Sequence, residues 1–394
     1  MPTVRLKPGH VQPVWAGHPW VYAQAIERVE GGPEKGDEVS VIDPRGNLLG
    51  RGFYSPGSAI PVRLLVRDAE TRLDSSFFSA RIARAASRRA ELGLPSDDTT
   101  GYRLVHAEGD ELPGLIVDRF GDVLVAQLLT FGMKAREGAI LDALAALPGV
   151  TAIVDRTPAQ TAKAEGFDAG SGFVRGTAVS ELAMTERGLA YRLPLEIGQK
   201  TGFYFDQRGL RGRVEALARG KRVLDAYSFV GSFAMAAARG GAEQVLAVDD
   251  SAIAVEIGQR CARANGLDAR IEHRKQDARK ALQDAAAEPF DLCVVDPPRL
   301  APTRGAREGA LVAYSKLAEA GCRATRLGGL LVFCSCSAAV DLAGLTRALG
   351  IGAMHAGRQA FVVERHFQGA DHPVSAAFNE GLYLKALVAR IESR

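Results

Sequence analysis

Residues 290–299 read Phe-Asp-Leu-Cys-Val-Val-Asp-Pro-Pro-Arg, and residues 329–337 read Gly-Leu-Leu-Val-Phe-Cys-Ser-Cys-Ser. Each stretch begins with a short apolar run of the kind that forms a buried strand, and each then turns polar. Ligands of open parallel sheets bind outside the carboxyl ends of the strands. The two stretches therefore predict that a carboxylate, Asp296, and a thiol, Cys336, lie at the same edge of a parallel sheet.

The chain from Lys221 onward alternates strands with helices. Such alternation implies right-handed crossovers and a parallel sheet. We therefore expect a carboxyl-terminal α/β domain of the Rossmann-like type over residues 191–394. Its predicted strands cover residues 222–226, 244–249, 271–273, 290–295 and 329–334, and its predicted helices open at Phe233 and cover 252–265 and 306–326.

Two smaller modules are expected ahead of this domain. Over residues 1–72, short strands at close spacing indicate a small β-barrel. Residues 73–190 have a mixed pattern, which indicates a central α+β module that ends in a hairpin with its turn near Gly188. The expected elements are strands at 39–43, 48–54, 60–66, 102–107, 114–117, 123–129 and 151–154, helices at 76–92 and 137–147, and the hairpin at 182–193.

The composition places the chain among ordinary globular proteins. Its 394 residues predict two or three domains, and 47% hydrophobic with 24% charged residues is typical of soluble proteins. No apolar run approaches the roughly 18 residues of a membrane span, and the first residues lack the apolar stretch of a secretion signal. Five scattered cysteines do not form a disulfide framework. We expect a cytoplasmic protein without membrane contact. Because the net charge is only +3, any RNA-binding surface must be a local basic patch.

The loop after the first α/β strand, residues 225–233, reads Asp-Ala-Tyr-Ser-Phe-Val-Gly-Ser-Phe. A dinucleotide site needs three spaced glycines, whereas this loop has one glycine and an acid. It suits S-adenosylmethionine (SAM), which carries an ammonium and a sulfonium but no phosphate. Asp249, at the next strand end, is placed to bind ribose hydroxyls, and Asp277, after the third strand, to bind an adenine amino group. Each acid alone is equally compatible with a solvated loop carboxylate, but three at successive strand ends are more specific.

Two cysteines follow the last of these strands. Most unpaired cysteines are small buried hydrophobes, and this remains an alternative for Cys336. Cys334, two residues earlier, would share its face if the strand continued. No group of ligands with tetrahedral zinc spacing accompanies the pair, so we expect no metal site. The remaining cysteines, at 261, 293 and 322, lie in apolar patterns and are expected in the core.

The Asp296-Pro297-Pro298-Arg299 segment predicts a corner at the end of a buried strand. Proline lacks an N–H donor, so the chain must leave the sheet there. The corner can then present carbonyl groups and a carboxylate to a base that has been flipped out of its stack. Similar corners recur in methyltransferases that act on planar nitrogens or bases. The alternative is a rigid turn without a ligand.

A thiol beside a carboxylate suits one demanding reaction, which is methylation of carbon 5 of a pyrimidine. This carbon is a poor nucleophile until a thiolate adds to carbon 6 and gives the ring enamine character. The thiolate must form near neutral pH, which requires a lowered pKa or a nearby base. A carboxyl group such as that of Asp296 could supply a proton or a hydrogen bond at nitrogen 3.

Long runs of this chain resemble the bacterial 23S rRNA 5-methylcytosine methyltransferases that carry an amino-terminal PUA domain. The resemblance covers essentially the whole length, and the runs are far more specific than any single motif. They are residues 17–22 and 50–56 in the PUA part, 109–121 in the linking module, 200–208 before the first catalytic strand, and 370–374 and 380–385, which match the family's carboxyl-terminal strands.

The resemblance implies a SAM site, a nucleophile and a substrate corner. Cys336 would be the nucleophile, with Asp296 beside the base and with Pro297, Pro298 and Arg299 near the substrate. The implied SAM-binding residues are Lys200, Thr201, Phe203, Asp206, Gln207, Arg208, Asp225, Tyr227, Ser228, Gly231, Asp249, Asp277 and Asp296.

Two departures matter for this assignment. Cys334 stands where relatives can have another residue, which leaves open which thiol reacts. The Asp-Pro-Pro-Arg segment also lacks the second cysteine that many RNA 5-methylcytosine enzymes use for product release, an arrangement shared with 5-methyluridine enzymes. Cytosine rather than uracil therefore rests on the resemblance.

Arginines form two candidate RNA-binding stripes. Arg81, Arg84 and Arg88 fall on one face of the predicted 76–92 helix, and a second cluster covers residues 211–222. The alternative for each stripe is a solvated helix face. Two tryptophans and a tyrosine, Trp15, Trp20 and Tyr22, are expected in the barrel core.

Other functions remain open. A methyltransferase acting on a base nitrogen could use the same corner and would not need Cys336. A non-catalytic RNA-binding or ribosome-assembly factor with a vestigial SAM fold is disfavoured by the acids at 225, 249, 277 and 296. The partner expected is 23S rRNA, and the resemblance makes a homodimer plausible.

Overall fold

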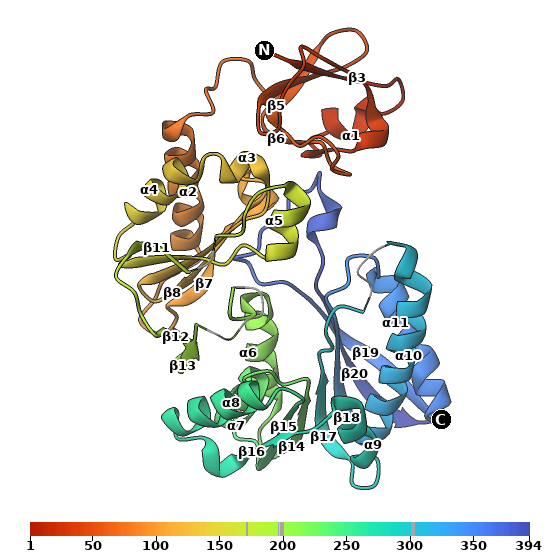
Figure 1. Cartoon of the computed structure of the whole chain (residues 1–394). Coiled ribbons are helices and arrows are strands. Elements are labelled where there is room, and N and C mark those ends of the chain that lie inside the picture. Colours follow the sequence, from red (N-terminus) through yellow and green to blue (C-terminus); the bar gives the residue numbers. More distant parts are fainter. Residues whose placement is uncertain (171, 196, 198–200, 301–303) are drawn as a thin grey trace. The chain divides into compact units, whose positions relative to one another are not determined.

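A computed structural model describes residues 1–170, 172–195, 197, 201–300 and 304–394. The chain folds into two compact units (Figure 1). The first unit comprises Met1–Thr185, Pro194–Phe203 and Ala370–Gly381, and the second comprises Glu186–Leu193, Tyr204–Gly369 and Leu382–Arg394. Lys200 lies outside the described residues.

Over residues 1–66, all of them described, six strands form one sheet in the order β2-β6-β5-β4-β1-β3. Its interior is a small valine and leucine core, with Val4, Val39 and Val41 fully buried. The sequence predicted β4, β5 and β6 and missed β1, β2 and β3, because β1 and β2 are four and two residues long and β3 has no alternating burial. The expectation of Trp15, Trp20 and Tyr22 in the core is wrong, since 74% of Trp15 is exposed and the other two are half-buried outside this core cluster. The elements are β1 (Thr3–Leu6), α1 (Val11–Trp15), β2 (Trp20–Val21), β3 (Ile26–Glu30), β4 (Glu38–Ile42), β5 (Leu48–Tyr54) and β6 (Val62–Val66).

The central part of the first unit is a five-stranded sheet, counted over the described residues, with the order β11-β10-β9-β8-β7. Helix α2 (Ser75–Glu91) begins where the Asp74 carboxylate accepts hydrogen bonds from Ser76 N and Phe77 N. It packs against α4 and β7. The other elements are β7 (Gly101–His106), β8 (Leu115–Phe120), β9 (Val123–Leu128), α3 (Phe131–Lys134), α4 (Glu137–Ala145), β10 (Ala152–Asp155), α5 (Ala159–Glu165) and β11 (Gly172–Gly176); the hairpin β12 (Glu181–Glu186) and β13 (Leu189–Pro194) follows as predicted.

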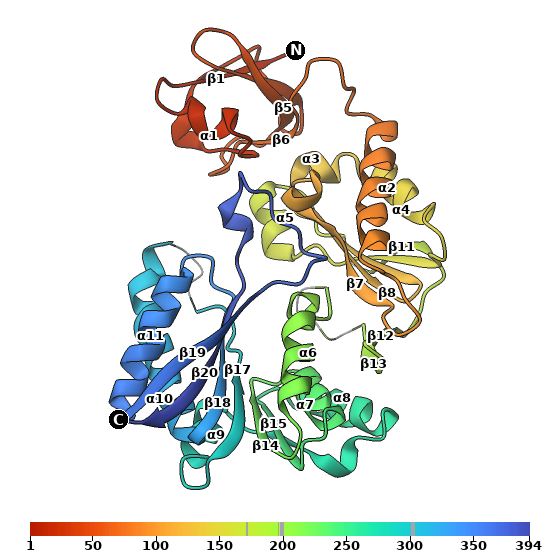
Figure 2. The same cartoon turned by 180° about the vertical axis from the view of Figure 1, so that it is seen from behind.

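The second unit is built on a sheet in which the described residues form seven strands, in the order β16-β15-β14-β17-β18-β20-β19 (Figure 2). The first five strands of this order pair in parallel, as the alternation predicted, and β20 is antiparallel to both β18 and β19. Strand β14 lies between β15 and β17, so the chain crosses to opposite sides of β14 there. Such a switch point is where doubly wound sheets bind ligands.

Helices cover both faces of this sheet, with α6, α7 and α8 grouped on one side and α9, α10 and α11 on the other (Figure 1). The strands are β14 (Arg222–Ala226), β15 (Gln244–Asp249), β16 (Ile271–Lys275), β17 (Phe290–Val295), β18 (Thr325–Ser335), β19 (Arg358–Phe367) and β20 (Lys385–Ser393). The helices are α6 (Arg208–Leu217), α7 (Ser232–Arg239), α8 (Ala252–Ala264), α9 (Ala278–Asp284), α10 (Arg307–Ala324) and α11 (Leu342–His355).

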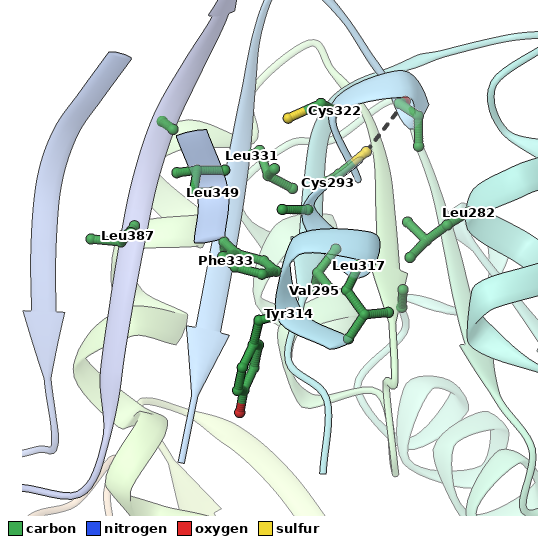
Figure 3. Packing of buried hydrophobic residues seen from close by; sticks show 14 of the residues in the cluster. Leu282, Cys293, Val295, Tyr314, Leu317, Cys322, Leu331, Phe333, Leu349 and Leu387 are labelled. Carbon is green, nitrogen blue, oxygen red and sulfur yellow. Dashed lines mark hydrogen bonds between the residues drawn. The ribbon is translucent and has the colours of Figure 1, made fainter. Parts of the chain in front are cut away.

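The core under α10 and α11 joins these helices to β17, β18 and β20 (Figure 3). Cys293 and Cys322 lie in it fully buried, and Cys261 is a buried residue of α8, so these three cysteines are core residues as predicted. Burial raises the pKa of the Cys293 thiol to about 12. Burial raises the pKa of the Cys322 thiol in the same way, so the Cys293 and Cys322 thiols are neutral and serve packing. No helix in the described part of the chain is long and apolar enough to cross a membrane.

Candidate active site

The strand register brings the predicted site residues of the second unit to one edge of the sheet. Ala226 pairs with Val248 on one side and with Val295 on the other, and Val295 in turn pairs with Phe333. The carboxyl ends of β14, β15, β17 and β18 are therefore level. We call these four strand ends and the loops that follow them the carboxyl edge.

The loop after β14 turns sharply where the chain leaves the sheet. Tyr227, Phe229 and Gly231 all have positive φ, at 66°, 50° and 72°. A Cβ atom on Gly231 would lie 2.8 Å from Nε2 of His273, so a larger residue is excluded there. The loop then enters α7, whose Ala234 N–H donates to Oδ2 of Asp225 at 3.0 Å. This carboxylate therefore holds the start of the helix against the end of β14.

Polar atoms that are buried at the carboxyl edge lack hydrogen-bond partners among the described residues. They are Oδ1 of Asp225, Oγ of Ser228 and Oε1 of Gln207. Asp225 is 1% exposed, and burial raises its pKa well above the usual range, with smaller contributions from Asp296 and Asp249. Buried polar groups normally have partners, so atoms without them point to a bound ligand. Acceptors gathered beside carboxylates fit the ammonium and sulfonium of SAM.

Asp249 and Asp277 have structural hydrogen bonds as well. Asp249 is half-buried and accepts from Phe229 N at 2.8 Å and from Ser251 N at 2.9 Å. Its pKa is raised, chiefly by burial. Asp277 is exposed and caps α9 by accepting from Lys280 N at 2.9 Å. These bonds fix the positions of the two carboxylates, of which Asp249 is the expected ribose ligand and Asp277 the expected adenine ligand.

The segment before α6 reaches the carboxyl edge through side chains. Gln207 is buried and donates from Nε2 to Oδ2 of Asp296 at 2.9 Å. Asp206 accepts from the Tyr383 hydroxyl at 2.6 Å, and Arg208 begins α6 half-buried. Asp206, Gln207 and Asp296 are thus held in fixed positions within the second unit.

Two predicted cofactor residues belong to the first unit. Thr201 is buried and donates its hydroxyl hydrogen to Asp118, while its carbonyl oxygen accepts from Arg156 at 3.0 Å. Phe203 is also buried there.

The two candidate thiols differ in their surroundings. Cys334 lies inside β18 and is fully buried, and burial followed by the charge of Asp296 raises its pKa well above the usual range. Cys336 follows the last residue of β18 and is half-buried. Its neighbours Ser335 and Ser337 are fully buried and contact the Tyr314 hydroxyl at 2.9 Å and 3.1 Å. The serine contacts hold the segment, and the thiol with greater access to solvent is that of Cys336.

The corner after β17 leaves the sheet as its prolines predicted. Pro297 is buried, whereas Pro298 and Arg299 are exposed. Among the residues that the structure describes, no group of three or more histidine, cysteine or acidic side chains could hold a metal ion.

The arginines expected to contact RNA have acidic partners. Arg81 and Arg84 form ion pairs with Glu111, and Arg88 pairs with both Asp110 and Glu111. In the second cluster, Arg211 is buried against Glu186 with two contacts of 2.6 Å. Much of this positive charge is therefore balanced within each unit, which the spacing of the arginines alone could not reveal.

Sequence reasoning missed three residues of the site: Tyr204, Tyr314 and Lys385. Tyr204 and Tyr314 have raised pKa values, mainly because of burial, and both lie close enough to Asp296 and Cys336 to respond to their charges. Lys385 is 3% exposed and begins β20. The sequence offered one sign that Lys385 is unusual, which is its position directly before the apolar run Ala386-Leu387-Val388-Ala389.

Comparisons with known proteins agree with this geometry. The family model of a PUA-like domain matches residues 4–67, and that of an S-adenosylmethionine-dependent methyltransferase matches residues 112–341. Two relatives named ribosomal RNA large subunit methyltransferase I are similar over nearly the whole chain. The protein of Shewanella denitrificans is 37% identical over 98% of this chain and 99% of its own length, and that of Klebsiella pneumoniae is 35% identical over 99% and 98%.

A solved structure shares the fold. SMU.776, described as a candidate methyltransferase complexed with SAH, superposes with a TM-score of 0.86 over 99% of this chain and 100% of its own, at 20% sequence identity. The fold, the unpartnered acceptors and the two family matches lead to one assignment. The chain belongs to the S-adenosylmethionine-dependent methyltransferase family and carries a PUA-like domain in its amino-terminal part.

Proposed function

We propose that this methyltransferase forms 5-methylcytosine in 23S rRNA through a covalent bond between Cys336 and the base. The observation that carries the proposal is the position of Cys336, a half-buried thiol just past the end of β18. Asp296 directly follows the adjacent strand β17, so its carboxylate lies at the same edge of the sheet. The names of the relatives supply the class of RNA, since both are ribosomal RNA large subunit methyltransferases.

SAM would be held by the acceptors of the carboxyl edge. Asp225, Ser228 and Gln207 would receive its cationic and polar groups, and Asp249 and Asp277 its ribose and adenine. Tyr227, Gly231, Asp206 and Arg208 would shape the surrounding loops, and Lys200, Thr201 and Phe203 stay predictions for the same site. Bound SAM supplies an electrophilic methyl group on its sulfonium.

The chain's own residues would perform the covalent steps. The Cys336 thiolate forms a bond from sulfur to carbon 6, and the electron pair of the carbon 5–carbon 6 double bond becomes available at carbon 5. The Asp296 carboxyl group donates a proton or hydrogen bond at nitrogen 3, which stabilises the ring as the charge develops. After methylation, a general base takes the proton of carbon 5, and the electron pair of that carbon–hydrogen bond restores the carbon 5–carbon 6 double bond. The sulfur–carbon bond breaks as the thiolate leaves, and a proton donated at nitrogen 3 returns to Asp296.

RNA would be bound by the PUA-like domain together with local contacts near the site. Pro298 and Arg299 are exposed beside the carboxyl edge and would meet the flipped base. Of the α2 arginines, Arg84 has the greatest access, because 58% of its side chain is exposed, so we retain it with Arg81 and Arg88 as a phosphate contact. We infer that the protein acts in the cytoplasm and forms a homodimer. Light scattering of the purified protein tests the homodimer.

The first experiment uses rRNA transcribed with 5-fluorocytidine in one sample and 5-fluorouridine in another. Each is incubated with SAM and with wild-type, Cys336→Ala or Cys334→Ala protein. We expect a denaturant-stable protein–RNA adduct with 5-fluorocytidine that requires SAM and Cys336, because fluorine cannot leave as a proton does. Cys334→Ala is the matched control and should still form it.

Each other outcome has a distinct meaning. Trapping by 5-fluorouridine alone would change the product to 5-methyluridine. An adduct lost with Cys334→Ala but kept with Cys336→Ala would move the nucleophile. Methyl transfer to unmodified rRNA without any adduct would overturn the covalent route and favour methylation of a base nitrogen, whereas SAM binding without any transfer would favour a ribosome-assembly factor.

A further inference from the structure

Lys385 is a buried lysine that the reaction described above does not yet use. Its side chain begins β20, and the register pairs it with Ser335 at the end of β18. The ammonium Nζ donates to the carbonyl oxygen of Ser337 at 2.9 Å. Lys385 therefore bridges the Cys336 segment, because its side chain bonds the residue after Cys336 while its backbone pairs with the residue before it.

Burial makes this ammonium costly to keep charged. Lys385 is 3% exposed, and burial lowers its pKa to about 8, while nearby Cys336 and Asp341 act in the opposite direction. Within the described ranges, no carboxylate forms an ion pair with it. A buried ammonium without an ion-pair partner is rarely kept for stability alone, and strongly perturbed groups gather at functional sites.

Of the titratable groups around Lys385, Cys336 is the one that we expect to carry the negative charge opposite its ammonium. Asp341 is 67% exposed in its side chain and caps α11 through Gly344 N at 2.7 Å. Burial keeps Tyr204, Tyr314 and Cys334 neutral, because each has a raised pKa. On β19, Phe367 lies opposite Lys385, while His366 and Glu364 contact each other at 2.9 Å. Asp296 accepts a hydrogen bond from Gln207, and its charge acts on the Cys334 thiol.

We propose that Lys385 is a positioning residue whose ammonium anchors the Cys336 segment and holds Cys336 in its thiolate form. The inference rests on the proposed function, because only the covalent route needs a thiolate there. The hydrogen bond to the Ser337 carbonyl holds the ammonium against the segment that carries the Cys336 sulfur. A cation beside a thiol favours ionisation of the thiol, which supplies the nucleophile near neutral pH.

The test follows the rate at which iodoacetamide alkylates Cys336 as a function of pH, in the full-length protein without RNA. Fragment mass spectrometry identifies the Cys336 product, and Cys336→Ala provides the background. Lys385→Met removes the charge at nearly constant volume, and Lys385→Arg restores a cation. We expect the midpoint of the Lys385→Met profile to move up by about one pH unit, so that alkylation at pH 7 is about tenfold slower. Lys385→Arg should recover most of this loss.

An unchanged midpoint in Lys385→Met protein that is folded by circular dichroism would overturn the proposal. If this variant does not fold, the reciprocal measurement applies. Lysines are labelled by ¹³C reductive methylation, and the pKa of Lys385 is compared between wild type and Cys336→Ala. We expect that pKa to fall when the thiol is removed, and equal values would overturn the proposal.

The alkylation assay needs neither RNA nor methyl transfer, so it fails independently of the proposed function. A midpoint that does not move, with an intact fluorocytidine adduct, would reject the role of Lys385 and leave the covalent route standing. A midpoint that moves without any adduct would support the Lys385–Cys336 coupling and reject the covalent route.

Discussion

At the scale of single residues, Asp225 is the carboxylate whose surroundings are least favourable in the absence of a ligand. It is 1% exposed, one of its oxygens has no partner in the described part of the chain, and its pKa is raised by burial. Its other oxygen holds the first turn of α7. A group that costs stability in this way is explained if a cationic ligand completes its surroundings.

We predict that Asp225→Asn stabilises the ligand-free protein and weakens SAM binding. Because the folded pKa lies above the unfolded one, ionisation of Asp225 opposes folding at any pH above the unfolded pKa. The variant should therefore gain about 1–3 kcal/mol at pH 7, and the gain should vanish below about pH 4. SAM affinity should fall by about 10–100-fold, as for a lost charged hydrogen bond. Urea denaturation at several pH values and titration calorimetry measure both effects.

Asp250→Asn is the control, since Asp250 is exposed and adjacent to the same site. It should change neither quantity by more than a few tenths of a kcal/mol. Equal SAM affinity in Asp225→Asn and wild type would show that Asp225 does not contact the cofactor.

At the scale of elements, α2 is joined to the rest of the first unit by a buried ion pair rather than by its exposed arginines. Arg89 is 1% exposed and contacts both oxygens of Asp110, at 2.6 Å and 2.7 Å. It also donates to the carbonyl oxygens of Arg103 at 2.9 Å and Asp371 at 2.7 Å. One guanidinium thus ties α2 to β7 and to the segment near residue 371.

We predict that Arg89→Ala destabilises the first unit by about 3–5 kcal/mol, because it leaves the Asp110 carboxylate buried without its partner. Arg84→Ala is the matched change on the same helix. Its side chain is 58% exposed and lies 3.3 Å from Glu111, so the loss should stay below about 1 kcal/mol. Tryptophan fluorescence during urea unfolding measures both. Equal losses in the two variants would contradict the difference in burial.

At the scale of the whole molecule, the two units carry different parts of the proposed function. The first contains the PUA-like domain, and the second contains the acceptors and the thiol of the carboxyl edge. The chain has two tryptophans, Trp15 and Trp20, and both belong to the first unit. Fluorescence therefore reports unfolding of the first unit, whereas circular dichroism reports both.

We predict that SAM stabilises the second unit preferentially. At about 100 times its Kd a ligand adds roughly 2.7 kcal/mol, which should raise the melting temperature of that unit by about 5–10 °C. The circular dichroism transition should shift, while the fluorescence transition should move less. Asp225→Asn at the same SAM concentration should reduce the shift, and a shift seen only by fluorescence would place the cofactor on the first unit.

The five parallel strands of the second unit and the positions of its acids followed from local pattern, whereas α6, α9, α11 and the antiparallel strands β19 and β20 did not. Strand and helix periodicities depend on neighbouring residues, and the crossover rule then sets parallel pairing, so Asp225, Asp249, Asp296 and Cys336 could be placed at strand ends. The same reasoning failed for β1, β2 and β3, which are short or lack alternation. The strands expected from the resemblance at 370–374 and 380–385 are also wrong, since β19 ends at Phe367 and β20 begins only at Lys385. The expectation for Trp15 also failed, because a single aromatic residue does not indicate whether its side chain faces the core or the solvent.

Only the tertiary structure decided which distant groups meet. Lys385 reaches the Cys336 segment across 48 residues of sequence, and the α2 arginines meet Glu111 from another element. Burial distinguished Cys334 from Cys336, whereas the sequence favoured Cys336 only because it lies further beyond the strand. Charge and periodicity are local properties of a chain, whereas ion pairing, desolvation and access to solvent depend on contacts that exist only once its strands and helices have packed.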